Sequence, residues 1–172
     1  KKVFLQKISA KKPAVRLEAV EKLANDPSVE NARLLLEVAF KSKFKDVQDA
    51  ARDALSRYKD DEQVCEYLVD LIEQQVASAA KAKAKGSEKS RPADKSKKND
   101  IDLNVVAAPV LLTLLSSESE DIADKALGVM EKAAAGSDDG VALVAVVADE
   151  LGAVGDETSV TVLTRLAGWK AV

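Results

Sequence analysis

Apolar residues recur at helical spacing along most of this chain. Val64, Tyr67, Leu68, Leu71 and Ile72 follow one another at i, i+3, i+4, i+7 and i+8. This spacing places them on one face of an α-helix and leaves the opposite face polar. The same periodicity elsewhere predicts nine helices, over residues 1–9, 13–24, 27–41, 45–58, 62–80, 104–116, 120–135, 140–154 and 157–168.

Composition favours an all-α fold. Of the 172 residues, 47% are hydrophobic but only 3% are aromatic. The hydrophobic residues are mostly Ala, Val and Leu, and such small side chains allow helices to approach closely. Four Pro and seven Gly are too few for the many tight turns of a β-sandwich. The length suits one domain or one short array of helices.

One pattern occurs three times along the chain. Val15, Val47 and Ile122 are each followed by a small residue four positions later and a large apolar residue eight positions later. The first two are 32 residues apart, and the third lies 75 residues beyond the second. A period of about 30–40 residues with two helices per unit is typical of an α-solenoid.

These segments carry a family resemblance. Residues 13–23 (Pro-Ala-Val-Arg-x-x-Ala-x-x-x-Leu) and 45–55 (Lys-Asp-Val-Gln-x-x-Ala-x-x-Ala-Leu) resemble the second helix of HEAT repeats. Residues 148–157 resemble the short HEAT-like repeat of bacterial proteins and bilin-lyase relatives, in which one helix ends and turns on Gly-Asp. The resemblance implies an α-solenoid of about four to five antiparallel helix pairs, a HEAT-like or armadillo-like superhelix.

The resemblance also implies a role for one arginine. In HEAT-like stacks, an Arg at the start of the second helix often pairs with an acidic residue of a neighbouring unit. Arg16 occupies that position, whereas Gln48 and Ala123 replace it in the other two segments. The phase of the repeat is ambiguous over residues 135–155, so the pattern does not show how the helices pair there.

Charge is distributed unevenly and suggests the domain organisation. Residues 1–80 have no net charge, residues 81–98 carry +6 and residues 99–172 carry −9. The basic stretch contains no apolar residue larger than Ala, so it cannot bury enough surface to offset the entropy of ordering. We therefore expect helical repeats over 1–80, a basic flexible insertion over 81–103, and repeats of the same array over 104–172. The first residues of the insertion could extend the preceding helix as far as Gly86.

Composition also excludes several kinds of site. The chain has no His and one Cys, so His-based catalytic triads, zinc sites of His or clustered Cys, and disulfides within the chain are excluded. We predict no catalytic residues, no cofactor and no metal.

Cys65 has no neighbouring Lys or Arg to lower the pKa of its thiol, so we predict a buried structural thiol. A lone Cys fits a reducing compartment, which favours a cytoplasmic location. The chain has no run of 18 apolar residues, and we predict no transmembrane segment.

The candidate interaction residues are mostly basic. Arg16, Arg52 and Arg57 lie on predicted helices, where local ion pairing is the alternative role. Lys95, Lys97 and Lys98 lie in the basic insertion, which could equally be a solvated loop. Trp169 could cover the last hydrophobic layer or anchor a partner.

The acidic clusters at 118–121, 138–139 and 156–157 fall at predicted helix starts, where they suit the helix dipole.

Three functions follow from these features. The first is a non-catalytic scaffold that presents a helical-repeat surface to a protein partner. The second is a bilin-lyase-like HEAT enzyme or chaperone, which rests on analogy of fold. The third is a tether to nucleic acid or another anionic surface through residues 81–98, although that stretch lacks aromatic residues to stack on bases.

Overall fold

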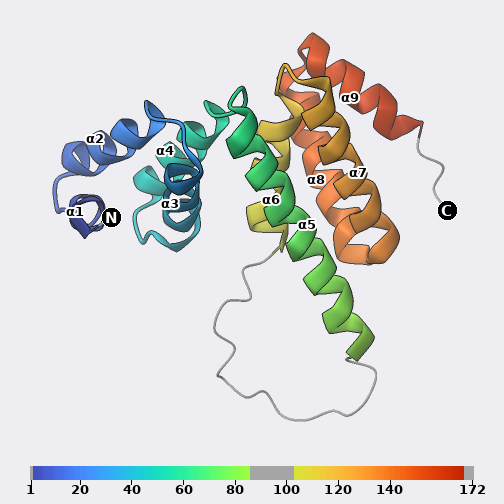
Figure 1. The fold of residues 1–172 in the computed structure, drawn as a ribbon, viewed down its shortest axis with the longest axis horizontal. Helices are drawn as coiled ribbons and strands as arrows, with labels where there is room; N and C mark the ends of the chain where they lie inside the picture. The colour runs from blue at the N-terminus through green and yellow to red at the C-terminus, as the bar shows by residue number, and fades with distance from the viewer. Residues whose placement is uncertain (1, 86–102, 169–172) are drawn as a thin grey trace.

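The structure, a computed structural model, describes residues 2–85 and 103–168 (Figure 1). Each of the nine helices expected from the periodicity is present within these ranges. They are α1 (Lys2–Ile8), α2 (Pro13–Ala24), α3 (Val29–Lys41), α4 (Lys45–Ser56), α5 (Glu62–Lys85), α6 (Leu103–Leu115), α7 (Glu120–Gly136), α8 (Asp138–Val154) and α9 (Glu157–Ala167).

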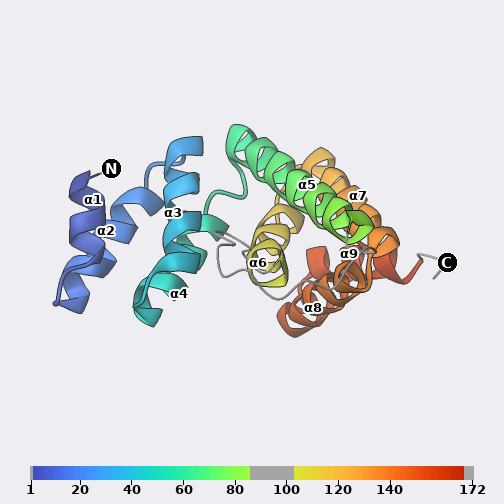
Figure 2. The ribbon, with the colours of Figure 1, turned by 90° about the horizontal axis from the view of Figure 1, so that it is seen from below.

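The helices form two layers. Neighbours in sequence pack as hairpins, α1 with α2, α3 with α4, α5 with α6 and α7 with α8. One layer is the succession α2, α4, α6, α8, and in the other α3 contacts α5 and α5 contacts α7. Figure 2 shows α3, α5 and α7 along one side and α4, α6 and α8 along the other. The fold is therefore an all-α helical-repeat array, as the periodicity predicts.

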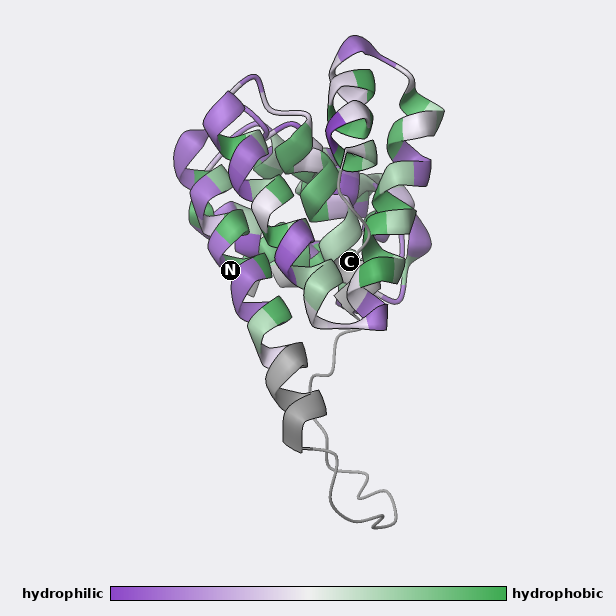
Figure 3. Cartoon of the chain, turned by 90° about the vertical axis from the view of Figure 1, so that its right-hand side faces the viewer, coloured by the Kyte–Doolittle hydropathy of each residue, from purple (hydrophilic) through white to green (hydrophobic). Residues whose placement is uncertain are grey.

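A single hydrophobic core runs through the array. It extends from Val20 on α2 to Val162 on α9 and includes residues of every helix from α2 to α9. Val64, Leu68 and Ile72 have no exposed surface, which confirms the predicted apolar stripe of α5. Figure 3 shows hydrophobic and hydrophilic residues alternating around most helices, as amphipathic helices require.

Most helix boundaries lie within two residues of the expected ones, and two of the differences have a clear local reason. Helix α3 begins at Val29 rather than at residue 27, because the Ser28 side chain caps it by accepting a hydrogen bond from Asn31 N at 3.3 Å. Helix α5 continues to Lys85 and extends beyond its neighbours (Figure 1), so residues 81–85 are helical rather than part of a flexible loop. Ala and Lys are good helix formers, which explains the extension.

The turn after α8 matches the expected Gly-Asp turn. Gly155 has φ 66°, the left-handed conformation that glycine adopts without steric cost, and it ends α8. The next residue, Asp156, caps α9 by accepting a hydrogen bond from Ser159 N at 2.7 Å.

Gly140 allows α7 and α8 to pack closely. A Cβ atom on Gly140 would lie 1.9 Å from the carbonyl oxygen of Ala133 on α7. No side chain fits at that distance, so the crossing of the two helices depends on glycine here.

Candidate functional site

Arg16 is buried at the junction between the first two hairpins. Its side chain is 7% exposed, and Nη2 donates to Asp46 Oδ2 on α4 at 2.7 Å. Nη1 donates to the carbonyl oxygens of Ala10 at 3.0 Å and Lys11 at 3.2 Å. Its Cζ lies 4.0 Å from the centre of the Phe44 ring, within cation–π range. The guanidinium thus joins the α1–α2 turn to the start of α4. This is the pairing with an acidic residue of a neighbouring unit that the resemblance implies, and contact of Arg16 with a partner stays a prediction.

Arg57 also joins α4 to α2, but at the surface. Nη1 lies 2.8 Å from Glu21 Oε1, and Nη2 lies 3.0 Å from Asp53 Oδ2. The hydrogen bonds that Arg57 donates to the carboxylates of Glu21 and then Asp53 raise its pKa. Its side chain is 45% exposed, so a partner could still reach it.

Arg52 has a looser setting on the same helix. Its Nη1 lies 3.7 Å from Asp49 Oδ1, and its Cζ lies 5.8 Å from the centre of the Phe40 ring. The buried Nε atom has no hydrogen-bond partner. Contact of Arg52 and Arg57 with a partner stays a prediction. Lys95, Lys97, Lys98 and Trp169 lie outside the described residues.

Tyr58 is a second polar link between the first two hairpins, which the sequence reasoning missed. Its hydroxyl donates to the carbonyl oxygen of Leu23, with the Asp26 carbonyl oxygen 3.2 Å away. Burial raises the pKa of Tyr58 to about 12, with further contributions from Asp26 and Asp61. The aromatic ring fits the apolar stripe of α4, so its spacing did not reveal the role of the hydroxyl.

Cys65 is buried, as predicted. Its Sγ donates to the carbonyl oxygens of Lys59 at 3.2 Å and Tyr58 at 3.6 Å. Burial, with the nearby charges of Asp61 and Asp60, raises the pKa of the Cys65 thiol to about 11. The thiol is therefore protonated at neutral pH, as a structural cysteine should be.

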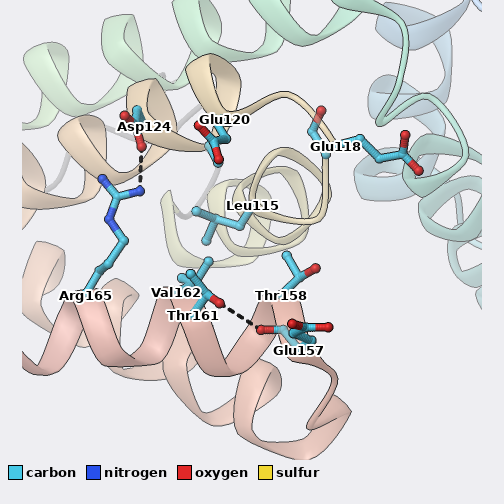
Figure 4. Close-up of a pocket in the computed structure, with 11 residues that line it drawn as sticks. Leu115, Glu118, Glu120, Asp124, Glu157, Thr158, Thr161, Val162 and Arg165 are labelled. Carbon is cyan, nitrogen blue, oxygen red and sulfur yellow. Dashed lines mark hydrogen bonds and ion pairs between the residues drawn. The ribbon is translucent and has the colours of Figure 1, made fainter.

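An open hollow lies where α6 turns into α7 and α9 begins (Figure 4). Its volume is about 560 Å³. Leu115 and Val162 lie beneath it and are buried, and Ser117, Thr158 and Thr161 contribute hydroxyl groups. The remaining lining residues are Glu118, Glu120, Ala123, Asp124, Glu157 and Arg165. The lining thus includes four carboxylates and one guanidinium.

The single cation of the hollow is already paired. Arg165 Nη1 on α9 lies 2.5 Å from Asp124 Oδ1 on α7, and Figure 4 shows this pair across the hollow. Asp156 adjoins the hollow, and hydrogen bonds from the Ser159 side chain and backbone lower its pKa, with Lys59 contributing less. The lining of the hollow thus holds more acidic than basic side chains, since Glu118, Glu120 and Glu157 add to the paired Asp124 and Arg165.

The sequence reasoning assigned these acidic clusters to the helix dipole. That role is correct for all three, since carboxylates occupy the first turns of α7, α8 and α9, and Asp156 also caps α9. The sequence did not indicate that two of these clusters lie close together. Residues 118–121 and 156–157 are brought together only by the packing of α9 near α6 and α7. Chemically, the carboxylates and hydroxyls are hydrogen-bond acceptors that suit an ammonium or guanidinium group.

Two further observations concern the described residues alone. In that part of the chain, no group of three or more Asp, Glu, Cys or His side chains could hold a metal ion. Within residues 2–85 and 103–168, no helix is both long and apolar enough to cross a lipid bilayer.

No protein-family model, curated protein or solved structure matches this chain. The resemblance to HEAT repeats therefore stays a prediction.

Proposed function

We propose that this chain is a non-catalytic scaffold of HEAT-like helical repeats that binds a protein partner. The acidic hollow between the α6–α7 turn and α9 carries this proposal. It is open to solvent, and several helices contribute to it. A site assembled from separate turns of a repeat array suits the binding of an extended segment of another protein.

The acidic lining of the hollow favours a basic partner segment. Glu118, Glu120 and Glu157 would accept hydrogen bonds from Lys or Arg side chains. A guanidinium has the further option of exchanging with Arg165 at Asp124. The expected partner is therefore a protein segment rich in Arg or Lys.

The test is a fluorescence anisotropy titration of the full chain with two labelled synthetic peptides. Both are flexible Gly-Ser peptides of the same length, and one carries three Arg where the other carries three Glu. The Arg peptide should bind the wild-type chain and lose affinity for the double variant Glu118→Gln/Glu157→Gln. The matched control, Glu30→Gln/Glu131→Gln, removes the same charge from exposed positions outside the hollow.

Binding of the Arg peptide that survives in the Glu118→Gln/Glu157→Gln chain would refute the hollow as the site. Equal loss in both double variants would show that only overall charge matters, and would refute it as well. Added salt should weaken a true interaction, because both partners are charged and exposed.

A further inference from the structure

The outward face of α8 exposes apolar residues to solvent. Val141 is 54% exposed and Val146 is 42% exposed, and Ala142 and Ala145 between them are also exposed. These four residues are referred to below as the α8 face. They lie opposite Leu143 and Val147, which pack into the core.

This face lacks the polar residues of an ordinary surface helix. From Gly140 to Ala148 the sequence contains no charged or polar side chain on any side of the helix. A helix that is apolar all round is normally covered on all sides. By contrast, α7 presents Lys125 and Lys132 to α5 at the surface, where they pair with Glu66 and Glu73. The α8 face therefore suits coverage by another apolar surface.

Carboxylates bracket the α8 face. Asp138 precedes it, and Asp149 and Glu150 follow it. Asp149 lies eleven positions after Asp138, which corresponds to about 16 Å along a helix. The stretch 133–164 contains no Lys or Arg, so α8 and its flanking turns supply no basic residue beside Asp138, Asp149 and Glu150.

These charges argue against a second copy of this chain as the occupant. If two α8 helices packed antiparallel, Asp138 of one copy would meet Asp149 and Glu150 of the other. If they packed parallel, each carboxylate would meet its own equivalent. Like charges meet in both arrangements, which opposes association.

We propose that the α8 face binds an amphipathic helix of a protein partner, one whose apolar residues are flanked at both ends by Lys or Arg. Valine and alanine side chains leave a shallow surface against which small apolar residues of a helix can pack. Basic residues about three turns apart on that helix would meet Asp138 at one end and Asp149 with Glu150 at the other. The inference rests on the proposed scaffold function, but it uses none of the residues that line the acidic hollow.

The probe is a synthetic helical peptide of about 18 residues, long enough to span the face. It carries an Ala/Leu stripe and two Lys at each end, and a matched peptide carries Glu in place of Lys. Each peptide is titrated into the isotope-labelled full chain. Amide chemical shifts locate the binding, and calorimetry gives the dissociation constant.

The Lys-ended peptide should bind and should shift amides of α8. The exposed substitutions Val146→Ser and, separately, Val141→Ser should each weaken it by roughly tenfold, since each removes apolar area from the interface. Asp149→Asn/Glu150→Gln should weaken it and reduce its dependence on salt. Val3→Ser, at a valine 65% exposed on α1, is the matched control and should leave binding unchanged.

Several results would overturn the inference. They are equal binding of the Glu-ended peptide, shifts confined to helices other than α8, or unchanged affinity in both Val141→Ser and Val146→Ser. A dimer in sedimentation experiments that dissociates on Val146→Ser would assign the face to a second copy instead. Glu118→Gln/Glu157→Gln should leave this binding intact, so failure of the hollow and failure of the α8 face are distinguishable.

Discussion

The two halves of the array hold their hairpins together differently. In α1–α4, buried polar side chains reach across the junction, Arg16 to Asp46 and Tyr58 to the Leu23 carbonyl oxygen. In α5–α9, α5 and α7 are joined at the surface by Lys125–Glu66 and Lys132–Glu73, while α7 and α8 come together at Gly140. Contacts between α3–α4 and α5–α6 are sparser than those inside either half.

Two kinds of contact therefore join neighbouring helices in this chain, buried hydrogen bonds in one half and close packing at a glycine in the other. A buried hydrogen bond orients two hairpins because its geometry is directional and its loss leaves unpaired polar groups. Close packing of small residues also fixes a crossing, but only if no side chain intervenes. Helix α8 also exposes Val141 and Val146 on its outer side. The C-terminal half carries both the apolar α8 face and the acidic hollow.

The largest effect is expected from Gly140→Ala in the C-terminal half. The new Cβ would overlap the Ala133 carbonyl oxygen, so α7 and α8 must separate, at a cost of about 3 kcal/mol. Urea denaturation followed by circular dichroism measures this loss. Gly152→Ala on the same helix is the control, because nothing lies within 4 Å of its added Cβ. The control should be stable or gain about 0.5–1 kcal/mol. Equal stability of the two variants would contradict the close crossing.

Arg16→Met should have the next largest effect, in the N-terminal half. It leaves two backbone carbonyls and the Asp46 carboxylate without their donor, which should cost about 2 kcal/mol. Hydrogen–deuterium exchange should accelerate over α1–α4 and stay unchanged over α7–α8, because few contacts join the halves. Arg33→Met, at an exposed position on α3, should change neither. Uniform acceleration along the chain would show that the halves unfold together.

Tyr58→Phe should cost less, about 1 kcal/mol, because it removes only the hydroxyl donor. The loss should again appear over α1–α4 in hydrogen exchange. A variant as stable as the wild type would mean that the hydroxyl adds nothing to the hairpin junction.

The same substitution should change the alkaline response. The pKa of Tyr58 rises from 10.0 to about 12 on folding, so the unfolded chain ionises first and stability falls between pH 10 and 12. Cys65, whose pKa rises from 9.0 to about 11, adds a similar loss between pH 9 and 11. Urea midpoints measured across these ranges should fall less steeply in Tyr58→Phe above pH 10 and in Cys65→Ala above pH 9. Unchanged slopes would contradict the burial of these groups.

The smallest effect is expected from Lys132→Ala. Its ammonium lies 2.8 Å from Glu73 Oε1, but the two side chains are 69% and 44% exposed. Water and salt screen such a pair, so the loss should stay below about 1 kcal/mol. A loss as large as that of Arg16→Met would mean that surface ion pairs, rather than core packing, join α5 to α7. Urea denaturation at low and high salt would reveal it.

Local sequence signals predicted the helices well. Hydrophobic period acts within one or two turns, so the apolar stripe of α5 was anticipated from spacing. The Gly-Asp turn before α9 was expected from the family resemblance. The start of α3 was wrong by two residues, because Asp26-Pro27 and Ser28 are both plausible starts in sequence. The ion pair of Arg16 with a neighbouring hairpin was expected from the family resemblance rather than from spacing alone.

The contacts between distant segments could not be anticipated in the same way. The hydroxyl of Tyr58 and the two acidic clusters of the hollow meet partners more than 30 residues away, and no local pattern encodes those distances. In α8, the uncharged stretch 140–148 has no polar side, so periodicity cannot identify its buried face.

Sequence alone thus established an all-α array and the extent of its helices, because helix formation depends on near neighbours. The packing of α8 against α6 and α7 selected which apolar side enters the core and which faces water. The buried side carries Gly140, whose missing side chain permits the close approach to Ala133.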